Sequence, residues 1–268
     1  MAPRSKEARE ALKSIIVEDK PGYVRSMFDS IAQNYDRMNW IMTGGLLALW
    51  HRAFLKLTNL REGESALDVC CGTGDLSFLM ARRVGPKGSV TGLDFSEKML
   101  EIAKARHESK AREKGASLAE ITWTHGDALD LPFEDGGDDR GFACVTMGFA
   151  LRNVADVARS ISEMARVARV GGRVICLEVS RPNNPVFRAG FNLYFFRLVP
   201  IIGRWAERRA RRSNQLSKLP PYTYLPYSLE HLPPSERILE MMREAGLSDV
   251  KQVPLTGGAV SLYVGVKS

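Results

Sequence analysis

The fold is decided by residues 66–75, whose sequence is ALDVCCGTGD. An apolar run enters this stretch and an amphipathic run leaves it, which predicts a strand, a tight turn and a helix. Gly72 and Gly74 allow the backbone to turn sharply and to approach a ligand closely at the carboxyl end of the strand. The third glycine of a dinucleotide-binding G-x-G-x-x-G would fall at Ser77. A cofactor without a pyrophosphate therefore fits this turn better.

Acidic residues follow the next two predicted strands. Asp94 ends the strand expected at residues 89–94, where a carboxylate can accept hydrogen bonds from both hydroxyls of a ribose. Asp127, followed by Ala128, comes after the strand expected at residues 121–125, where an acid can meet the amino group of adenine. Three ligand-facing turns at consecutive strand ends predict a nucleoside site.

Strands and helices alternate from residue 65 onward, which predicts βαβ units and a mostly parallel sheet. The last two strands are joined by a short connection and are expected to pair antiparallel. The count of strands is seven, one more than in a six-stranded dinucleotide-binding sheet. Strands are expected at residues 65–70, 89–94, 121–125, 142–147, 173–179, 250–254 and 260–266, and helices up to residue 84, from a Ser96 cap to about 113, at 157–170 and at 235–245.

Two further regions surround this alternating pattern. Residues 1–60 are expected to form an N-terminal helical cap, with helices at 23–37 and 46–57. Residues 61–268 are expected to form the main domain, interrupted at about 183–234 by a helical and basic insertion.

The composition is that of an average soluble globular chain, with 44% hydrophobic and 26% charged residues among 268. No uninterrupted apolar run approaches the ~18 residues that a membrane-spanning helix needs. Four cysteines suggest reduced thiols, of which Cys144 and Cys176 lie in apolar strand-like runs. No cysteine or histidine pair has zinc-ligand spacing, so no metal site is expected.

The net charge of +7 is concentrated in one segment. Residues 204–218 hold six basic residues against Glu207 alone, a local +5, so the rest of the chain carries +2. Such a patch favours an anionic partner, a phospholipid surface or a nucleic acid, although a solvated helix end explains it equally well.

Aromatic residues gather immediately before the basic segment. The helical spacing of several of them predicts one aromatic face, either an ordinary core helix or a lid that admits a prenyl or phytyl tail. The aromatic residues are Phe187, Phe191, Tyr194, Phe195, Phe196 and Trp205.

The N-terminus lacks the apolar region of a signal peptide. Residues 1–20 carry five basic and four acidic residues, whereas transit peptides are poor in acids. An intact transit peptide is therefore not expected. The compartment stays open between the cytoplasm and, for a processed form, the plastid stroma, in either case peripheral to a membrane.

With these motifs in place, the chain resembles the ubiquinone/menaquinone biosynthesis C-methyltransferase family, a group of class I S-adenosylmethionine-dependent enzymes. The resemblance covers roughly residues 22–268. The matching stretches are VRSMFDSIAQNYDRMN (24–39), DVCCGTGDL (68–76), GLDFS (92–96), GDALDLPF (126–133), MGFALRNV (147–154), GGRVICLEV (171–179) and YTYLPYS (222–228).

The resemblance implies a fold and an activity. The fold is α/β: a Rossmann-like seven-stranded sheet, mostly parallel with an antiparallel last strand, plus N-terminal helices and a helical insertion after the fifth strand. The activity is C-methylation of a prenylated or phytylated quinol ring, with S-adenosylmethionine as cofactor and without a metal. Demethylmenaquinol, demethylphylloquinol and a ubiquinol precursor all stay open as substrates. An anionic membrane surface is the expected partner and nucleic acid is not. Oligomeric state is open.

Carried over position by position, the family pattern implies a set of cofactor contacts. Tyr35 closes over the cofactor with Asp36 behind it. Cys70 replaces a common glycine, which restricts the backbone, and Gly148 replaces a common serine, so one side-chain hydrogen bond is lost. The cofactor-binding residues are Gly72, Thr73, Gly74, Asp94, Asp127, Ala128 and, through its backbone, Gly148.

Methylation of a ring carbon needs a strong nucleophile. A quinol becomes one when a hydroxyl beside the target carbon loses its proton. Arg152 is the main candidate for stabilising the resulting oxyanion or orienting a water that takes the proton, because its guanidinium stays charged. His125 is a second candidate, for proton transfer. Asn153 is expected either to cap the following helix or to hold the substrate.

Three other functions are weighed against this one. A nucleic-acid methyltransferase is suggested by the basic patch and by LPPY at 219–222, yet that motif belongs after the fourth strand. A nicotinamide oxidoreductase conflicts with Ser77 and the seventh strand. A non-catalytic scaffold within a quinone-biosynthesis assembly conflicts with the intact Gly72, Gly74 and Asp94.

Overall fold

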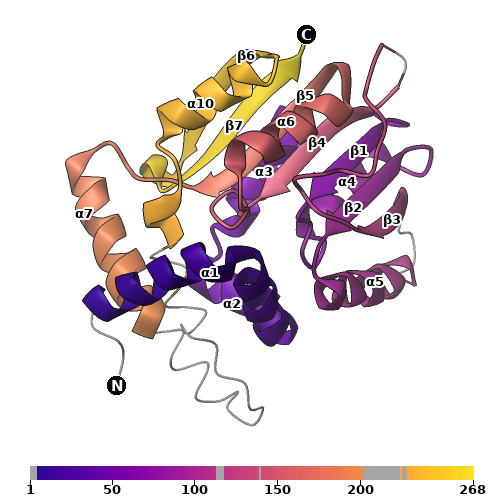
Figure 1. The fold of residues 1–268 in the computed structure, drawn as a ribbon. Helices are drawn as coiled ribbons and strands as arrows, with labels where there is room; N and C mark the ends of the chain where they lie inside the picture. Colours follow the sequence, from indigo (N-terminus) through magenta and orange to yellow (C-terminus); the bar gives the residue numbers. More distant parts are fainter. Residues whose placement is uncertain (1–4, 113–117, 139, 202–223, 225–227) are drawn as a thin grey trace.

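A seven-stranded sheet forms the centre of the molecule (Figure 1). The computed structural model describes residues 5–112, 118–138, 140–201, 224 and 228–268. The order of strands across the sheet is β3-β2-β1-β4-β5-β7-β6. The strands are β1 (Ser65–Val69), β2 (Ser89–Asp94), β3 (Glu120–His125), β4 (Phe142–Gly148), β5 (Ala168–Val179), β6 (Leu247–Leu255) and β7 (Val260–Lys267).

Strands β1 to β5 run parallel, and β7 runs antiparallel between β5 and β6. Only the 3₁₀ turn Thr256–Gly258 joins β6 to β7, and a connection that short can only produce antiparallel neighbours. The predicted seven-stranded, mostly parallel sheet is confirmed. The strand order reverses between β1 and β4, and open α/β sheets bind ligands at the carboxyl ends of the strands beside such a reversal.

Helices cover both faces of the sheet (Figure 1). Helices α6 (Val157–Val167) and α10 (Ser235–Glu244) pack on one face, and α3 (Leu47–Thr58) and α4 (Asp75–Val84) on the other. Side chains of β1 alternate between the two buried clusters, with Leu67 on the α6 side and Ala66 on the α3 side. Helix α5 (Glu97–Ala111) contacts β2 and β3, and Ser96 caps it as predicted by accepting a hydrogen bond from the Met99 amide at 3.2 Å.

The N-terminal helices differ from the single helix expected at 23–37. Helix α1 spans Ser5–Ile31, a 3₁₀ turn follows at Ala32–Asn34, and α2 covers Tyr35–Thr43. Helix α1 is broken at Asp19, where φ is −165° and ψ is 80°. The Asp19 carboxylate accepts the Gly22 amide at 2.9 Å, the usual pattern of a residue that begins a helix. The expected helix was wrong in extent: α1 already begins at Ser5, and the 3₁₀ turn at Ala32–Asn34, which no glycine or proline marks, divides it from α2.

Helix α3 is built into the core, although it lies within the expected N-terminal cap. Phe54 is fully buried and Leu60 is 1% exposed, in the same cluster as β1 and α4. The division at residue 60 stays a prediction.

The insertion after β5 begins as expected with helix. It contains α7 (Pro185–Leu193) and a π-helical turn, η2, at Tyr194–Leu198. The basic residues 204–218 and Trp205 lie outside the described residues. A short 3₁₀ helix, η3 (Leu229–His231), precedes α10. Among the described residues, no helix combines the length and the apolar character needed to cross a membrane.

Candidate active site

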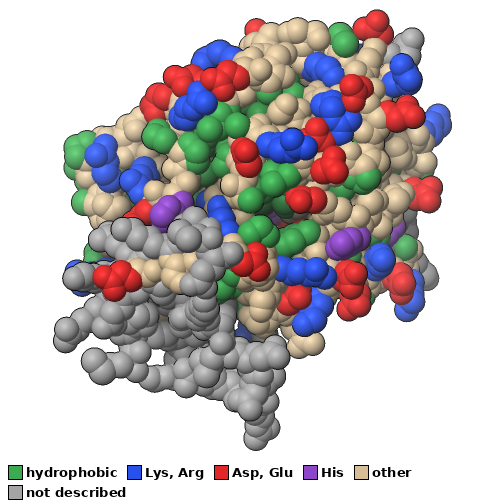
Figure 2. All heavy atoms as spheres, viewed as in Figure 1, with side chains coloured by type: hydrophobic (Ala, Val, Ile, Leu, Met, Phe, Trp, Pro, Cys, Tyr) green, Lys and Arg blue, Asp and Glu red, His purple; other side chains and the backbone are tan. Residues whose placement is uncertain are grey.

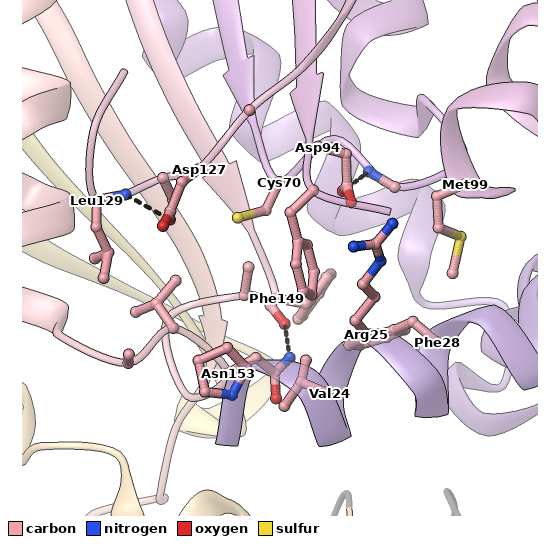
Figure 3. A pocket seen from close by; sticks show the side chains of 18 of the residues that line it. Val24, Arg25, Phe28, Cys70, Asp94, Met99, Asp127, Leu129, Phe149 and Asn153 are labelled. Atoms are coloured by element: carbon pink, nitrogen blue, oxygen red, sulfur yellow. Dashed lines mark hydrogen bonds between the residues drawn. The ribbon is translucent and has the colours of Figure 1, made fainter. Parts of the chain in front are cut away.

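Two adjoining cavities open at the carboxyl ends of the central strands. The first, of about 260 Å³, is bordered by α1 and the ends of β2 and β3 (Figure 3). The second, of about 190 Å³, is bordered by α2, α3, α7 and η2. A ligand filling one cavity abuts a ligand filling the other along a shared wall. The wall consists of Tyr35, Cys70, Gly72, Gly148 and Phe149.

The glycine turn after β1 forms part of this wall. Gly72 and Gly74 have φ of +55° and +90°, a region that favours glycine. A Cβ at Gly74 would lie 2.6 Å from the Trp123 ring, so no side chain fits there. Cys70 also has a positive φ, +56°, which costs a non-glycine residue on the order of 1 kcal/mol. This strained position is the one where the resemblance marks a missing glycine.

Asp94 fastens the glycine turn to the end of β2. Its Oδ2 accepts the Gly72 amide at 2.8 Å and its Oδ1 accepts the Ser96 amide at 2.9 Å. Burial raises the pKa of the Asp94 carboxyl, and the two amides oppose that shift because they favour the charged form. Each carboxylate oxygen keeps a further lone pair, so the group can still accept hydroxyls from the cavity.

The end of β3 supplies the opposite side of the first cavity. Asp127 is exposed, and its Oδ1 accepts the Leu129 amide at 2.9 Å, while Ala128 is buried. Figure 3 shows the Asp127 and Leu129 side of the cavity facing the Asp94 and Met99 side. Apolar side chains complete the walls, which suits a planar base. They are Val24, Phe28, Phe95, Met99 and Leu129.

Helix α2 is fastened over the glycine turn by a charged cluster. Asp36 accepts the Thr73 hydroxyl at 2.6 Å and pairs with Arg106 of α5 at 2.9 Å. Arg106 also donates to the Thr73 carbonyl and pairs with Asp75 at 2.7 Å. These contacts hold Tyr35, the first residue of α2, in the wall between the cavities. Asp36, next to Tyr35 in the chain, thus faces Thr73 and Arg106.

Arg152 borders the second cavity and is paired with a buried acid. Its Nη1 donates to Glu178 of β5, which is fully buried, and Arg152 itself is 7% exposed. Glu178 also accepts the backbone amides of Arg152 and Val179. The Nε of Arg152 is buried and has no hydrogen-bond partner among the described residues. The guanidinium is therefore anchored through Nη1 at the border of the second cavity.

The second cavity is otherwise mostly apolar. Phe191 and Phe195 stack with ring centroids 5.1 Å apart, as their helical spacing predicts. The Tyr194 hydroxyl donates to the Met42 carbonyl and so joins η2 to α2. The cavity suits an acceptor with an aromatic ring and a hydrocarbon tail. Its apolar walls include Leu47, Trp50, Phe191, Phe195, Val199 and Val260.

The other two polar candidates border the first cavity, whereas Arg152 borders the second. His125 borders the first cavity, exposed, with Nε2 3.1 Å from the Phe95 carbonyl oxygen. Asn153 also borders the first cavity and contacts the Phe149 carbonyl and the Tyr224 hydroxyl. Of the two roles expected for Asn153, the cap of the following helix was wrong, and the substrate contact stays a prediction. Asp156 begins α6 instead, and its carboxylate accepts the Arg159 amide at 3.0 Å.

Sequence reasoning missed His51, which borders the second cavity from α3. It lies four residues after Leu47 and one after Trp50, on the face of α3 that points inward. A histidine within the apolar stripe of a helix was the available signal. Burial lowers the pKa of its imidazole.

The first cavity fits the expected nucleoside. Carboxylates end β2 and β3, the floor is a glycine turn, and the remaining walls are largely apolar. No cluster of backbone amides or arginines for a pyrophosphate is needed for such a ligand. Among the described residues, no three His, Cys, Asp or Glu side chains gather in an arrangement that would hold a metal ion.

The chain is similar to known proteins over most of its length. The family model described as the ubiE/COQ5 methyltransferase family matches residues 15–267. The chain is similar to the demethylmenaquinone methyltransferase of Symbiobacterium thermophilum, with 43% identity over 93% of this chain and 94% of the relative. It is 39% identical to the enzyme of the same name from Staphylococcus aureus strain JH9, over 91% and 92% of the two chains.

Solved structures extend the comparison to the fold. A SAM-dependent methyltransferase from Aquifex aeolicus superposes with a TM-score of 0.54 at 16% identity, over 81% of this chain and 89% of that one. A methyltransferase from Thermotoga maritima gives 0.55 at 18% identity, over 91% and 100%. These likenesses establish a class I methyltransferase fold.

Proposed function

Because the chain belongs to the ubiE/COQ5 methyltransferase family, we propose that its acceptor is demethylmenaquinol, a quinol ring with a prenyl tail. The chain is an S-adenosylmethionine-dependent C-methyltransferase of quinone biosynthesis. When bound, S-adenosylmethionine supplies a methyl group on a positively charged sulfur. Demethylmenaquinol is the proposed acceptor because the relatives from Symbiobacterium thermophilum and Staphylococcus aureus are demethylmenaquinone methyltransferases.

The observation that carries the proposal is the shared wall. Gly72, Gly148 and Phe149 border both cavities, so an acceptor ring can lie directly against the cofactor. Methyl transfer is an in-line displacement that needs alignment and exclusion of water. A hydrophilic acceptor would gain little from the apolar walls of the second cavity, whereas a prenylated ring would bury its surface there.

Three groups in the first cavity are assigned to the cofactor. Asp94 would accept the ribose hydroxyls while holding Gly72 in place. Asp127 would accept the adenine amino group, and Ala128 would line the base. Thr73 and Gly74 do not border the first cavity and would act indirectly. Thr73 donates to Asp36, and Gly74 is the residue before α4. Tyr35 would close the wall over the reacting atoms.

Arg152 is assigned to the acceptor. Its anchored guanidinium would stabilise the oxyanion that forms when the quinol hydroxyl loses its proton. Such preorganised positive charge acts most strongly where water is excluded. Glu178 would keep the guanidinium in one orientation, because the pair is buried.

We assign the tail of the acceptor to the walls formed by α7 and η2. These elements present Phe191 and Phe195 to the cavity, and other apolar side chains on the same elements face solvent. Val186 is 78% exposed and Leu193 is 61% exposed. Residues 181–201 contain three arginines and no acid. An apolar and basic segment of this kind suits the surface of an anionic membrane, where a prenylated substrate resides.

Sedimentation with vesicles tests the membrane assignment. We expect the protein to pellet with vesicles of anionic phospholipid at low salt and less at moderate salt. A Val186→Ser/Leu193→Ser double variant should pellet less. Absence of binding to anionic vesicles at low salt would contradict the assignment.

Incubation with labelled S-adenosylmethionine tests the function. Demethylmenaquinol, demethylphylloquinol and a demethylated ubiquinol precursor are supplied separately in reduced form, and the products are identified by mass analysis. We expect the label on a ring carbon of demethylmenaquinol. Label on oxygen, or preferential transfer to one of the other two quinols, would contradict the proposed acceptor.

Basic and acidic side chains are interspersed over the face of the molecule that Figure 2 shows. The basic segment 204–218, which suggested nucleic acid, lies outside the described residues. The apolar second cavity favours a quinol over a nucleic-acid acceptor.

A further inference from the structure

If the proposed function holds, the quinol hydroxyl needs a proton acceptor, and a side chain of the second cavity can supply it. Arg152 cannot be that group, because a guanidinium stays protonated. Burial raises the pKa of Tyr35 and, well above its usual value, that of Cys70. Both side chains therefore carry their protons at neutral pH and cannot accept another.

The two acids that border the cavity are occupied by other partners. Asp75 pairs with Arg106 at 2.7 Å. Asp68 is 1% exposed and accepts hydroxyl hydrogens from Ser77 at 2.7 Å and Thr146 at 3.0 Å. Each oxygen of the Asp68 carboxyl thus already accepts a hydroxyl from within the protein.

His51 has the position that a proton acceptor requires. Its neighbour on α3, Trp50, is 8% exposed and donates from Nε1 to the Thr256 hydroxyl at 2.8 Å. The Trp50 ring lies 6.1 Å from the ring of Phe149, which belongs to the shared wall. Phe54, one turn further along α3, is fully buried. Helix α3 is thus fixed against the junction of the two cavities, with His51 on the cavity side.

The surroundings keep the imidazole ready to accept a proton. Burial lowers the pKa of His51, and the nearby Asp75 carboxylate opposes this with a smaller effect. In the part of the chain that the structure describes, no hydrogen bond occupies the ring nitrogens of His51. The titratable and charged groups around the same cavity are Tyr35 from α2, Asp68 from β1, Cys70 and Cys71 from the glycine turn, Asp75 from α4, Arg152 from the segment after β4, and Tyr194 from η2.

We propose that His51 is the catalytic base that takes the proton from the quinol hydroxyl. The O–H bond breaks, the proton moves to a ring nitrogen of His51, and Arg152 stabilises the oxyanion. The oxygen electron pair shifts into the ring, and the adjacent ring carbon forms a bond to the methyl carbon. The S–CH₃ bond breaks with its electron pair remaining on sulfur.

The remaining proton transfers complete the reaction and return His51 to its starting form. The newly methylated carbon loses its own hydrogen as a proton to water, and the ring regains aromaticity as an oxyanion. The oxyanion takes back the proton from His51. One proton is released to solvent in each turnover, and His51 returns to its neutral form without an oxidant or reductant.

Paired glutamine variants and a pH profile test the proposal. His51→Gln keeps a polar side chain but cannot accept the proton. His107→Gln is the matched control, since His107 lies on α5 against the Phe78 and Trp123 rings and outside both cavities. Turnover is measured with demethylmenaquinol kept reduced, and binding of S-adenosylhomocysteine is measured by calorimetry.

The expected result separates the two histidines. Wild-type turnover should fall in acid with an apparent pKa below that of free histidine. His51→Gln should lose roughly 100-fold in kcat and should lack this acid limb, with unchanged S-adenosylhomocysteine affinity. Added imidazole should partly restore His51→Ala. His107→Gln should behave as the wild type does.

Three results would overturn the proposal in distinguishable ways. Wild-type turnover and pH profile in His51→Gln would remove the base role alone. Loss of turnover together with weaker S-adenosylhomocysteine binding or a lower melting temperature, in both His51→Gln and His51→Ala, would make His51 a structural residue. Failure of the wild type to methylate any of the demethylquinols would remove the proposed function and the base role together.

Discussion

The two cavities are built from different kinds of structure. The first is formed mainly by turns at the ends of consecutive strands, and its polar groups hold one another through short local contacts such as Asp94 to Ser96. The second is formed by helices from distant parts of the chain, joined by contacts such as Tyr194 to Met42 and Trp50 to Thr256. The first cavity is therefore suited to one invariant ligand. The second can change with its helices and so determine the acceptor.

The largest effect is expected from Asp94→Asn, which alters the first cavity and should weaken ligand binding there. The amide removes a charged acceptor for the ribose and leaves one of the two backbone amides without its partner. We expect a loss of about 3 kcal/mol, or roughly 100-fold in affinity for S-adenosylhomocysteine. Calorimetric titration measures it, with Asp130→Asn as the control. A change below threefold would mean that Asp94 only supports the turn.

This half of the site was also the more predictable one. Gly72, Gly74, Asp94 and the Ser96 cap are local features, because each depends on residues within a few positions along the chain. The break at Asp19 and the Asp156 cap are local too, yet their sequences permit alternatives. The pairing of Asp36 with Arg106 and the place of His51 depend on how helices pack, which no short motif encodes.

Arg152→Lys alters the second cavity and should leave ligand binding in the first cavity unchanged. A lysine keeps the positive charge beside Glu178 but loses the fork that fixes its direction. We expect kcat to fall roughly 30-fold, with unchanged cofactor affinity. Single-turnover measurements with quinol supplied check this, and Arg237→Lys on the exposed face of α10 is the control. Near-normal turnover would reject the assigned role of Arg152.

Phe195→Ala tests where the tail of the acceptor binds, because Phe195 is expected to contact the acceptor only through its tail. Loss of one ring from the stacked pair should lower kcat/KM for a long-tailed quinol roughly 10-fold. A quinol without a tail should react at nearly the wild-type rate. Phe187→Ala is the control, since Phe187 is 59% exposed and borders neither cavity. Equal losses for both quinols would place the tail elsewhere.

The smallest effect is expected from Gly148→Ser in the shared wall. An added Cβ would lie 2.7 Å from the Cδ1 of Leu76, and this methyl is the end of a flexible side chain that can rotate away. We expect less than about 1 kcal/mol of destabilisation and less than threefold change in cofactor affinity. Thermal melting and calorimetry measure both. A tenfold loss would show that Leu76 cannot yield.

The ion pairs of Arg106 have a consequence for the order of events. They hold α2, and with it Tyr35, against the glycine turn, so the first residue of one helix borders both cavities. A ligand that steadies α2 from one cavity would therefore strengthen binding in the other, and thermodynamic reciprocity makes the effect equal in both directions. This coupling through α2 would add to the direct contact that methyl transfer requires between the two ligands.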